Sequence, residues 1–85
     1  MRVTLLYFAS VREAIGTGEE MRELPDAVLT PRGLMAWLAT LGEGYALAFA
    51  VPEKLRCAID QAMVATDAAL GEAKEIAFFP PVTGG

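Results

Sequence analysis

The chain has 85 residues, which is enough for one domain built around a single hydrophobic core. Hydrophobic residues make up 54 % of it, so we expect a folded globule rather than a disordered chain. The formal net charge is −4 and the seven Lys and Arg residues are scattered, which argues against nucleic-acid binding because phosphates need a clustered basic surface.

The residue types that usually carry catalysis or hold metals are scarce. Histidine, the commonest general base and metal ligand, is absent, and no Walker-type phosphate loop occurs. We therefore expect no metal site, no bound cofactor and no active site of the chain's own. Neither a signal peptide nor a membrane-spanning run is expected, and the single cysteine, Cys57, cannot form an internal disulfide, so the cytoplasm is the expected compartment. Cys57 itself is expected to be a small buried residue.

The first predicted elements are a strand and a short helix. Residues 3–8 are rich in β-branched and aromatic residues and are apolar on both faces, as in a central strand that is covered on two sides. Ser10 and Glu13 have the spacing of a capping box, which predicts a helix over 11–15. Gly16 is placed to end that helix.

A second strand and the main helix are predicted next. Residues 19–24 form a weaker strand candidate that could return antiparallel to the first. Thr30 and Pro31 predict the N-cap and the first position of the main helix. Gly42 is expected to end this helix, after apolar residues that repeat at helical spacing, namely Leu34, Leu38 and Leu41.

The remaining segments predict one more helical turn, a hairpin and a last strand. Residues 45–50 are apolar and suggest the helical turn. Residues 54–59 and 62–64 would pair around Asp60-Gln61, although the favoured hairpin turns contain glycine. Residues 75–79 alternate in direction as a strand does.

This order of elements predicts an α+β domain with a mixed sheet packed on one main helix. With the last strand inside the sheet, the arrangement resembles the β-grasp, or ubiquitin-like, architecture. We expect residues 1–79 to form that domain and residues 80–85 to form a flexible tail that ends in two glycines.

The predicted tail is a slim strand that ends in a carboxylate and could enter a narrow passage in another protein. Pro80 and Pro81 favour an extended conformation, and six residues span roughly 20 Å at about 3.3 Å each. A carboxylate at Gly85 must be activated before it can transfer an acyl group or carry sulfur, most simply as an acyl-adenylate made from ATP. The alternative is a frayed terminus without a function. The residues expected to thread into a partner are Pro80, Pro81, Val82, Thr83 and Gly84.

Two aromatic residues beside the tail are candidates for a partner interface. If the main helix covers the face of the sheet that holds Phe78, then Phe79 lies on the other face, next to the tail. Exposed aromatic residues in that position suit an interface, and Tyr7, Leu6 or Phe8 could extend the same patch. Packing of Phe79 in the core is the alternative.

Residues 78–85 resemble the C-terminal motif of the small subunits of molybdopterin synthase, the molybdopterin-converting factor subunit 1 family. Phe8-Ala9, Arg12-Glu13 and Gly16 are similar to the first strand and helix of that family. Residues 58–61 also resemble it, although many relatives have asparagine where this chain has Asp60. The substitution concerns the hairpin rather than sulfur chemistry.

The resemblance implies a β-grasp sulfur carrier. In that family an E1-like enzyme adenylates the residue that corresponds to Gly85, and a sulfurtransferase converts it to a thiocarboxylate. The tail enters the large subunit of a heterotetrameric synthase and donates sulfur to cyclic pyranopterin monophosphate, so that this chain would be the non-catalytic subunit. Three alternatives stay open: a sulfur carrier for thiamine-thiazole synthesis, a ubiquitin-like modifier of lysines, and an interaction domain with an inert tail.

Overall fold

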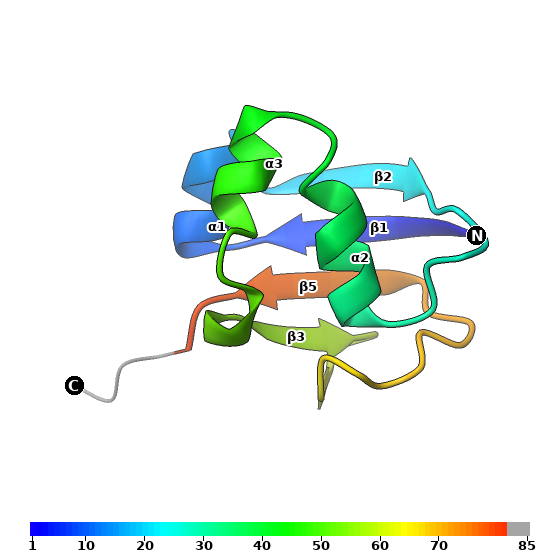
Figure 1. Cartoon of the computed structure of the whole chain (residues 1–85). Helices are drawn as coiled ribbons and strands as arrows, with labels where there is room; N and C mark the ends of the chain where they lie inside the picture. The colour runs from blue at the N-terminus through cyan, green and yellow to red at the C-terminus, as the bar shows by residue number, and fades with distance from the viewer. Residues whose placement is uncertain (82–85) are drawn as a thin grey trace.

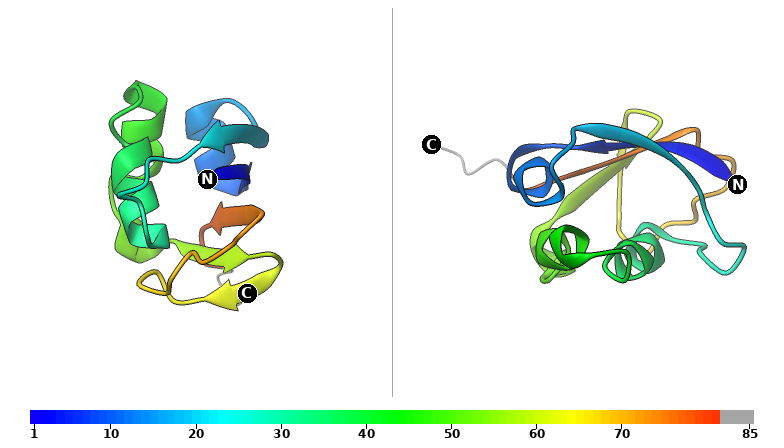
Figure 2. Two further views of the ribbon diagram at one scale, coloured as in Figure 1. Left: turned by 90° about the vertical axis from the view of Figure 1, so that its right-hand side faces the viewer. Right: turned by 90° about the horizontal axis from the view of Figure 1, so that it is seen from above.

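The structure is a computed structural model that describes residues 1–81, so the predictions for Val82, Thr83, Gly84 and Gly85 lie outside the described residues. Within that range a single mixed sheet is covered on one face by helices (Figures 1 and 2). The elements in chain order are β1 (Arg2–Tyr7), α1 (Ala9–Ile15), β2 (Glu19–Glu23), α2 (Pro31–Leu38), α3 (Glu43–Ala48), the 3₁₀ turn η1 (Pro52–Lys54), β3 (Arg56–Ile59), β4 (Ala62–Val64) and β5 (Glu75–Phe79).

The last strand lies in the centre of the sheet. The strand order is β2-β1-β5-β3-β4, so β5 has a parallel neighbour in β1 and an antiparallel neighbour in β3. The outer strands β2 and β4 pair antiparallel to β1 and β3 (Figure 1). This topology confirms the predicted α+β class, the mixed β-grasp sheet and the interior position of the last strand.

The core lies between the sheet and the helices α2 and α3. Alternate residues of β1 and β5 point into it because successive side chains of a strand face opposite ways. The fully buried contributors include Leu5, Tyr7, Ile76 and Phe78 from the strands and Leu34, Met35 and Leu38 from α2. Burial of each such side chain contributes roughly 1.5–3 kcal/mol, so these alternations determine which face of the sheet the helices cover.

The opposite face of the sheet is open in the described part of the chain. The expectation that β1 is covered on both sides is therefore wrong. Val3 is buried on the helix side, whereas Thr4 and Leu6, which alternate with it, stay partly exposed. Viewed from above, α2 and α3 lie together below the sheet (Figure 2).

Helix α1 begins earlier than predicted and without the capping box. Its N-cap is Phe8, no side chain caps it, and Ser10 lies inside the helix. The Phe8 carbonyl accepts hydrogen bonds from the amides of Val11 (3.1 Å) and Arg12 (3.4 Å), so backbone bonds close the first turn and the helix starts before the position that the capping box requires. Gly16 ends the helix at φ 95°, as predicted.

The main helix is shorter than predicted. Thr30 caps it as expected, since its Oγ1 accepts from the amide of Gly33 at 3.0 Å. The helix ends at Leu38, however, because the amides of Thr40 and Leu41 bond to carbonyls three residues back and the Thr40 hydroxyl donates to the Trp37 carbonyl at 2.6 Å. Leu41 is consequently exposed, and Gly42 begins α3 instead of ending α2.

Helix α3 packs closely against α1. A Cβ atom at Gly44 would lie 2.5 Å from the carbonyl oxygen of Ala14, closer than real contacts allow. The glycine therefore permits the two helices to approach, and the predicted helical turn over 45–50 becomes a helix that is fixed against the end of the sheet.

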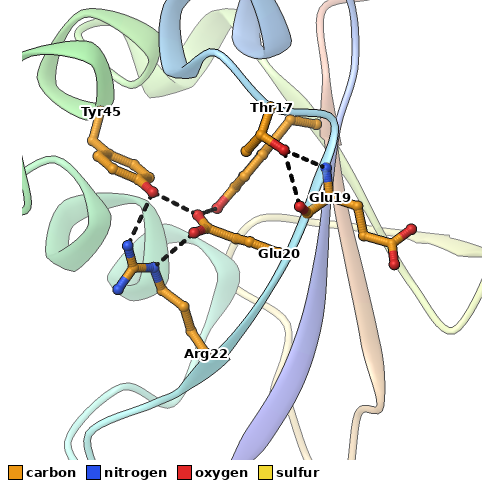
Figure 3. Close-up of polar contacts among 6 residues, drawn as sticks. Thr17, Glu19, Glu20, Arg22 and Tyr45 are labelled. Carbon is orange, nitrogen blue, oxygen red and sulfur yellow. Dashed lines mark hydrogen bonds and ion pairs between the residues drawn. The ribbon is translucent and has the colours of Figure 1, made fainter.

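A cluster of polar side chains, here called the tyrosine clamp, ties α3 to β1 and β2 (Figure 3). The hydroxyls of Tyr7 and Tyr45 both donate to Glu20 Oε2 at 2.7 Å. Arg22 donates from Nη2 to the Tyr45 hydroxyl at 3.0 Å and pairs through Nε with Glu20 Oε1 at 3.3 Å. The apolar core holds the strands and the helix that carry these side chains. The hydrogen bonds of the clamp then fix the orientation of α3 relative to β1 and β2.

The clamp favours the ionised form of Glu20. Burial raises the pKa of the Glu20 carboxyl, but the hydrogen bonds from Tyr7 and Tyr45 and the charge of Arg22 lower it by more, so its pKa lies below the ordinary value. Burial, followed by the bond to Glu20, raises the pKa of Tyr7. At neutral pH the clamp therefore holds a carboxylate and two protonated hydroxyls.

The predicted hairpin is confirmed, and its turn has a second role. Asp60 and Gln61 have φ values of 48° and 72°, the left-handed conformation that two-residue hairpin turns require. Asp60 Oδ1 also accepts from the amides of Lys74 (3.0 Å) and Glu75 (2.9 Å). The turn therefore fixes the first residue of β5, which explains why a short polar residue with an Oδ1 acceptor suits position 60.

The rest of the described chain contains little other polar chemistry. Cys57 is buried, as predicted. Within residues 1–81 no group of three acidic or cysteine side chains is placed to hold a metal ion. None of the helices in the same range has the length and the apolar character needed to cross a bilayer.

The clamp predicts that the free energies of unfolding of the wild-type chain and of Glu20→Gln differ by an amount that depends on pH. Because the folded-state pKa of Glu20 is lowered, its stabilisation is complete above the unfolded-state value of about 4.3 and is lost as the pH falls through the lower folded-state pKa. We expect Glu20→Gln to cost about 1–2 kcal/mol at pH 7 and to narrow its gap to wild type in acid. Urea unfolding across this range measures both, with Glu19→Gln as the control, since that side chain points away from the clamp (Figure 3). A constant gap at all pH values would contradict the prediction.

The hairpin predicts that the oxygen of Asp60, rather than its charge, stabilises the start of β5. Asp60→Ala removes the acceptor of two amides in an exposed place and should cost about 1 kcal/mol of unfolding free energy. Asp60→Asn keeps both the acceptor and the tolerance for positive φ and should stay within about 0.5 kcal/mol of wild type. Chemical denaturation compares the three proteins, and equal losses for both variants would show that the charge matters instead.

Candidate functional site

The candidate site is the end of β5, where the chain leaves the sheet. Phe79 is the last residue of the strand and pairs with Arg56 of β3. Pro80 and Pro81 follow, and because neither has an amide hydrogen the ladder cannot continue through them. The chain exits at the end of the sheet remote from the N-terminus (Figure 1). Of the residues predicted to thread, Pro80 is half-buried, Pro81 is exposed, and residues 82–85 lie outside the described range.

Phe8 and Phe79 lie together beside this exit. Their rings meet edge to face, with centroids 6.3 Å apart and an interplanar angle of 82°. The amide of Phe8 donates to the carbonyl of Phe78 at 3.2 Å, so the parallel pairing of β1 and β5 sets the position of both rings. Ala9, at φ 50°, then turns the chain away into α1. Phe8 is 48 % exposed and Phe79 is partly exposed, so both stand outside the core. Their contact with a partner stays a prediction.

Further apolar side chains continue this pair across the open face. Strand register places Leu6 beside Ala77, Ala77 beside Ala58, and Ala58 beside Met63, which is 62 % exposed. We call this set the open-face strip; its members are Leu6, Phe8, Ala58, Met63, Ala77 and Phe79. Ala77 itself is only 7 % exposed, and Leu6, Ala58 and Phe79 are partly exposed. An apolar sheet face that no helix covers is typical of a surface that binds another protein. Ala58, Met63 and Ala77 were not predicted to belong to an interface, because only the strand register places residues of different strands side by side.

A groove of about 440 Å³ lies on the other side of the same exit. Its apolar wall is formed by Leu47 and Ala48 of α3, Val51 and Leu55 beyond that helix, and Pro80. Leu47 is 71 % exposed and Val51 is 45 % exposed, so this apolar wall is open to solvent. We call this hollow the tail-root groove. From the sequence, residues 45–50 were predicted only as an apolar helical turn, with no relation to the tail.

The charges around the groove are mostly positive. Lys54 and Arg56 line it, together with Glu53. Glu53 is drawn towards Arg32, whose Nη1 lies 3.6 Å from Glu53 Oε1, whereas neither Lys54 nor Arg56 forms an ion pair within residues 1–81. A chain whose formal net charge is −4 thus presents a cationic rim next to its tail.

The described residues of the site are suited to binding rather than to covalent chemistry. The thiol of Cys57 is buried, donates to the carbonyl of Val64 at 3.4 Å, and has a pKa that burial raises. A thiol in that state is a poor nucleophile. The described residues around the tail root therefore offer an apolar and charged surface, to which the thiol of Cys57 does not contribute.

Comparison with known proteins agrees with this geometry. The model of the ThiS family matches residues 5–85. The chain is 39 % identical, over 83 residues, to the molybdopterin synthase sulfur carrier subunit of Escherichia coli, covering 98 % of this chain and 99 % of that protein. It is 40 % identical over the same length to the protein of that name from Haemophilus influenzae, with the same coverage.

Two solved structures share the fold. SAMP1 from Haloferax volcanii covers 100 % of both chains with a TM-score of 0.71 and 20 % identity. A putative molybdopterin converting factor, subunit 1, from Pyrococcus furiosus covers 96 % of this chain and 99 % of its own, with a TM-score of 0.67 and 22 % identity. At such identities the likeness concerns the β-grasp fold alone. The family match and the full-length relatives nevertheless confirm the predicted resemblance: the chain belongs to the ThiS family and is a relative of the molybdopterin synthase sulfur carrier subunits.

Proposed function

We propose that this chain is the sulfur carrier subunit of a molybdopterin synthase and that the carboxylate of Gly85 carries the sulfur. The observation that carries the proposal is the identity of about 40 % over almost the whole length to two proteins of that name. The placement of β5 supports it, because a strand held on both sides leads straight into the sequence Pro-Pro-Val-Thr-Gly-Gly.

The chemistry begins with activation of a carboxylate. An E1-like enzyme would join the Gly85 carboxylate to the α-phosphate of ATP, releasing pyrophosphate and leaving an acyl-adenylate. A sulfurtransferase would then supply a sulfur nucleophile that displaces AMP and leaves a thiocarboxylate. In the large subunit the sulfur of this thiocarboxylate would form a bond to cyclic pyranopterin monophosphate, and water would then cleave the bond between that sulfur and the Gly85 acyl carbon, which leaves the sulfur on the pterin and restores the carboxylate. Two such donations would build the dithiolene of molybdopterin.

This chain contributes presentation rather than catalysis to that sequence. Pro80 and Pro81 limit the conformations of the tail and so reduce the entropy lost when it is threaded into a partner. The slim residues Gly84 and Gly85 would enter a passage that is too narrow for side chains. Phe8 and Phe79 would dock against the large subunit, within a heterotetramer of large and small subunits.

The proposal places the chain in the cytoplasm, where the buried thiol of Cys57 stays reduced. No cofactor needs to be bound to the chain itself, because ATP is consumed by the activating enzyme. The sulfur cargo is covalent and is held on Gly85 only between activation and donation.

The first test is the mass of the intact chain after incubation with ATP, the cognate activating enzyme and a sulfur source. We expect the mass to rise by the difference between one sulfur and one oxygen atom. Deleting Gly84-Gly85 should abolish this change while the unfolding free energy stays at the wild-type value, because β5 ends at Phe79.

Other outcomes of that test separate the alternatives. An unmodified chain in the presence of a competent activating enzyme would contradict every carrier function. Isopeptide bonds to lysines would favour a protein modifier, and co-purification with a thiazole synthase would favour the thiamine pathway.

The second test concerns the aromatic pair beside the tail. Phe79→Ser removes one ring of the pair from the open face and should weaken binding to the large subunit by about 2–4 kcal/mol, as expected for a central interface anchor. Leu29→Ser is the control, since Leu29 is 68 % exposed but lies before α2, away from the tail. Calorimetric titration measures both, and a folded Phe79→Ser protein that binds like wild type would exclude Phe79 from the interface.

A further inference from the structure

The tail-root groove and the open-face strip meet at the exit of the chain. Arg56, which lines the groove, is the register partner of Phe79, which ends the strip. Pro80 then belongs to the groove wall itself. A partner that encloses the tail therefore has to approach its root from both sides.

The strip alone is small for a stable interface. Specific interfaces bury about 800 Å² on each partner and involve roughly 20–30 residues a side. The open-face strip has six members, two of them alanines, so contacts must continue beyond it. The groove adjoins the strip and is both hollow and apolar. Its wall residues Leu47 and Val51 are exposed and can contact another protein.

The wall is held in place before any partner arrives. Leu47 lies on α3, whose Tyr45 is fixed by the tyrosine clamp and whose Gly44 packs against Ala14. A surface that is already ordered loses less conformational entropy on binding than a loop would. An exposed leucine on such a helix is consequently suited to contact an apolar side chain of another protein.

The positive charges at the rim of the groove favour a partner that is negatively charged there. Lys54 and Arg56 are among the residues that line the groove, and neither forms an ion pair in the described range, while the nearby Glu53 is paired with Arg32. Complementary charge would come from carboxylates, which also speed the encounter of two proteins.

We propose that the tail-root groove is a second docking surface, which receives an apolar side chain flanked by Asp or Glu from the large subunit. The proposal rests on the proposed function, since it names the chemistry of the segment that borders the entrance to the tail passage. The open-face strip and the groove then grip the partner on opposite sides of the tail root.

The experiment titrates the full-length chain against its large subunit at low and high salt. Lys54→Glu/Arg56→Glu reverses the rim and should weaken binding about tenfold or more, mainly through slower association, and should reduce the dependence on salt. Leu47→Ser should weaken binding about fivefold or more at both salt concentrations. The controls are Lys74→Glu, which reverses an exposed charge before β5 at the other end of the sheet, and Leu29→Ser. Both should bind within about twofold of wild type.

The outcomes of this titration distinguish failure of the groove proposal from failure of the proposed function. If the groove variants bind like wild type while Phe79→Ser is impaired, the groove proposal is overturned and the proposed function stands. If wild-type protein itself fails to bind the large subunit, the proposed function fails and the groove proposal with it. Sedimentation of the carrier alone gives a further check, because a homodimer that the groove variants abolish would assign the groove to a second copy and overturn the proposal. Unchanged thermal unfolding of each variant excludes misfolding as the cause.

Discussion

The parallel pairing of β5 with β1 is the constraint on which the rest of the molecule depends. It places the last strand in the middle of the sheet, with β3 on its other side, so the tail leaves from a rigid body rather than from a frayed edge. The same pairing carries Phe8 to the level of Phe79 through the hydrogen bond from the Phe8 amide to the Phe78 carbonyl. The position of the exit and the position of the aromatic pair thus have one cause.

Helix α3 is held at the same end of the sheet as the exit of the tail. Two independent contacts fix α3 there: the close approach of Gly44 to Ala14 and the bonds of Tyr45 with Glu20 and Arg22. Packing of Tyr45, Ala48 and Phe49 on the core holds the same segment. Together these contacts determine where Leu47 lies, and so they position one wall of the groove at the tail root.

The local patterns in the sequence predicted most of the fold. Strand alternation, the Thr30-Pro31 helix start and the hairpin all have causes within a few residues of themselves, and these predictions are confirmed. The capping box at Ser10 was wrong because the helix begins at Ala9 with Phe8 as its N-cap, which leaves Ser10 inside the helix. The extent of the main helix was wrong because Leu41 continues the helical spacing although the backbone has tightened after Leu38. The open-face strip and the groove depend on strand register and on helix packing, which no local pattern contains.

A carrier of this size has to solve a problem of specificity with very few side chains. The diglycine end carries no side chain, so it cannot tell one partner from another, and selectivity must come from the surface around its root. An apolar strip alone would bind many proteins weakly, whereas a strip joined to a cationic groove requires both shape and charge to match. The placement of Lys54 and Arg56 beside an exit on an otherwise acidic chain is consistent with that requirement. The reacting group can then remain chemically simple because recognition is carried by the folded body next to it.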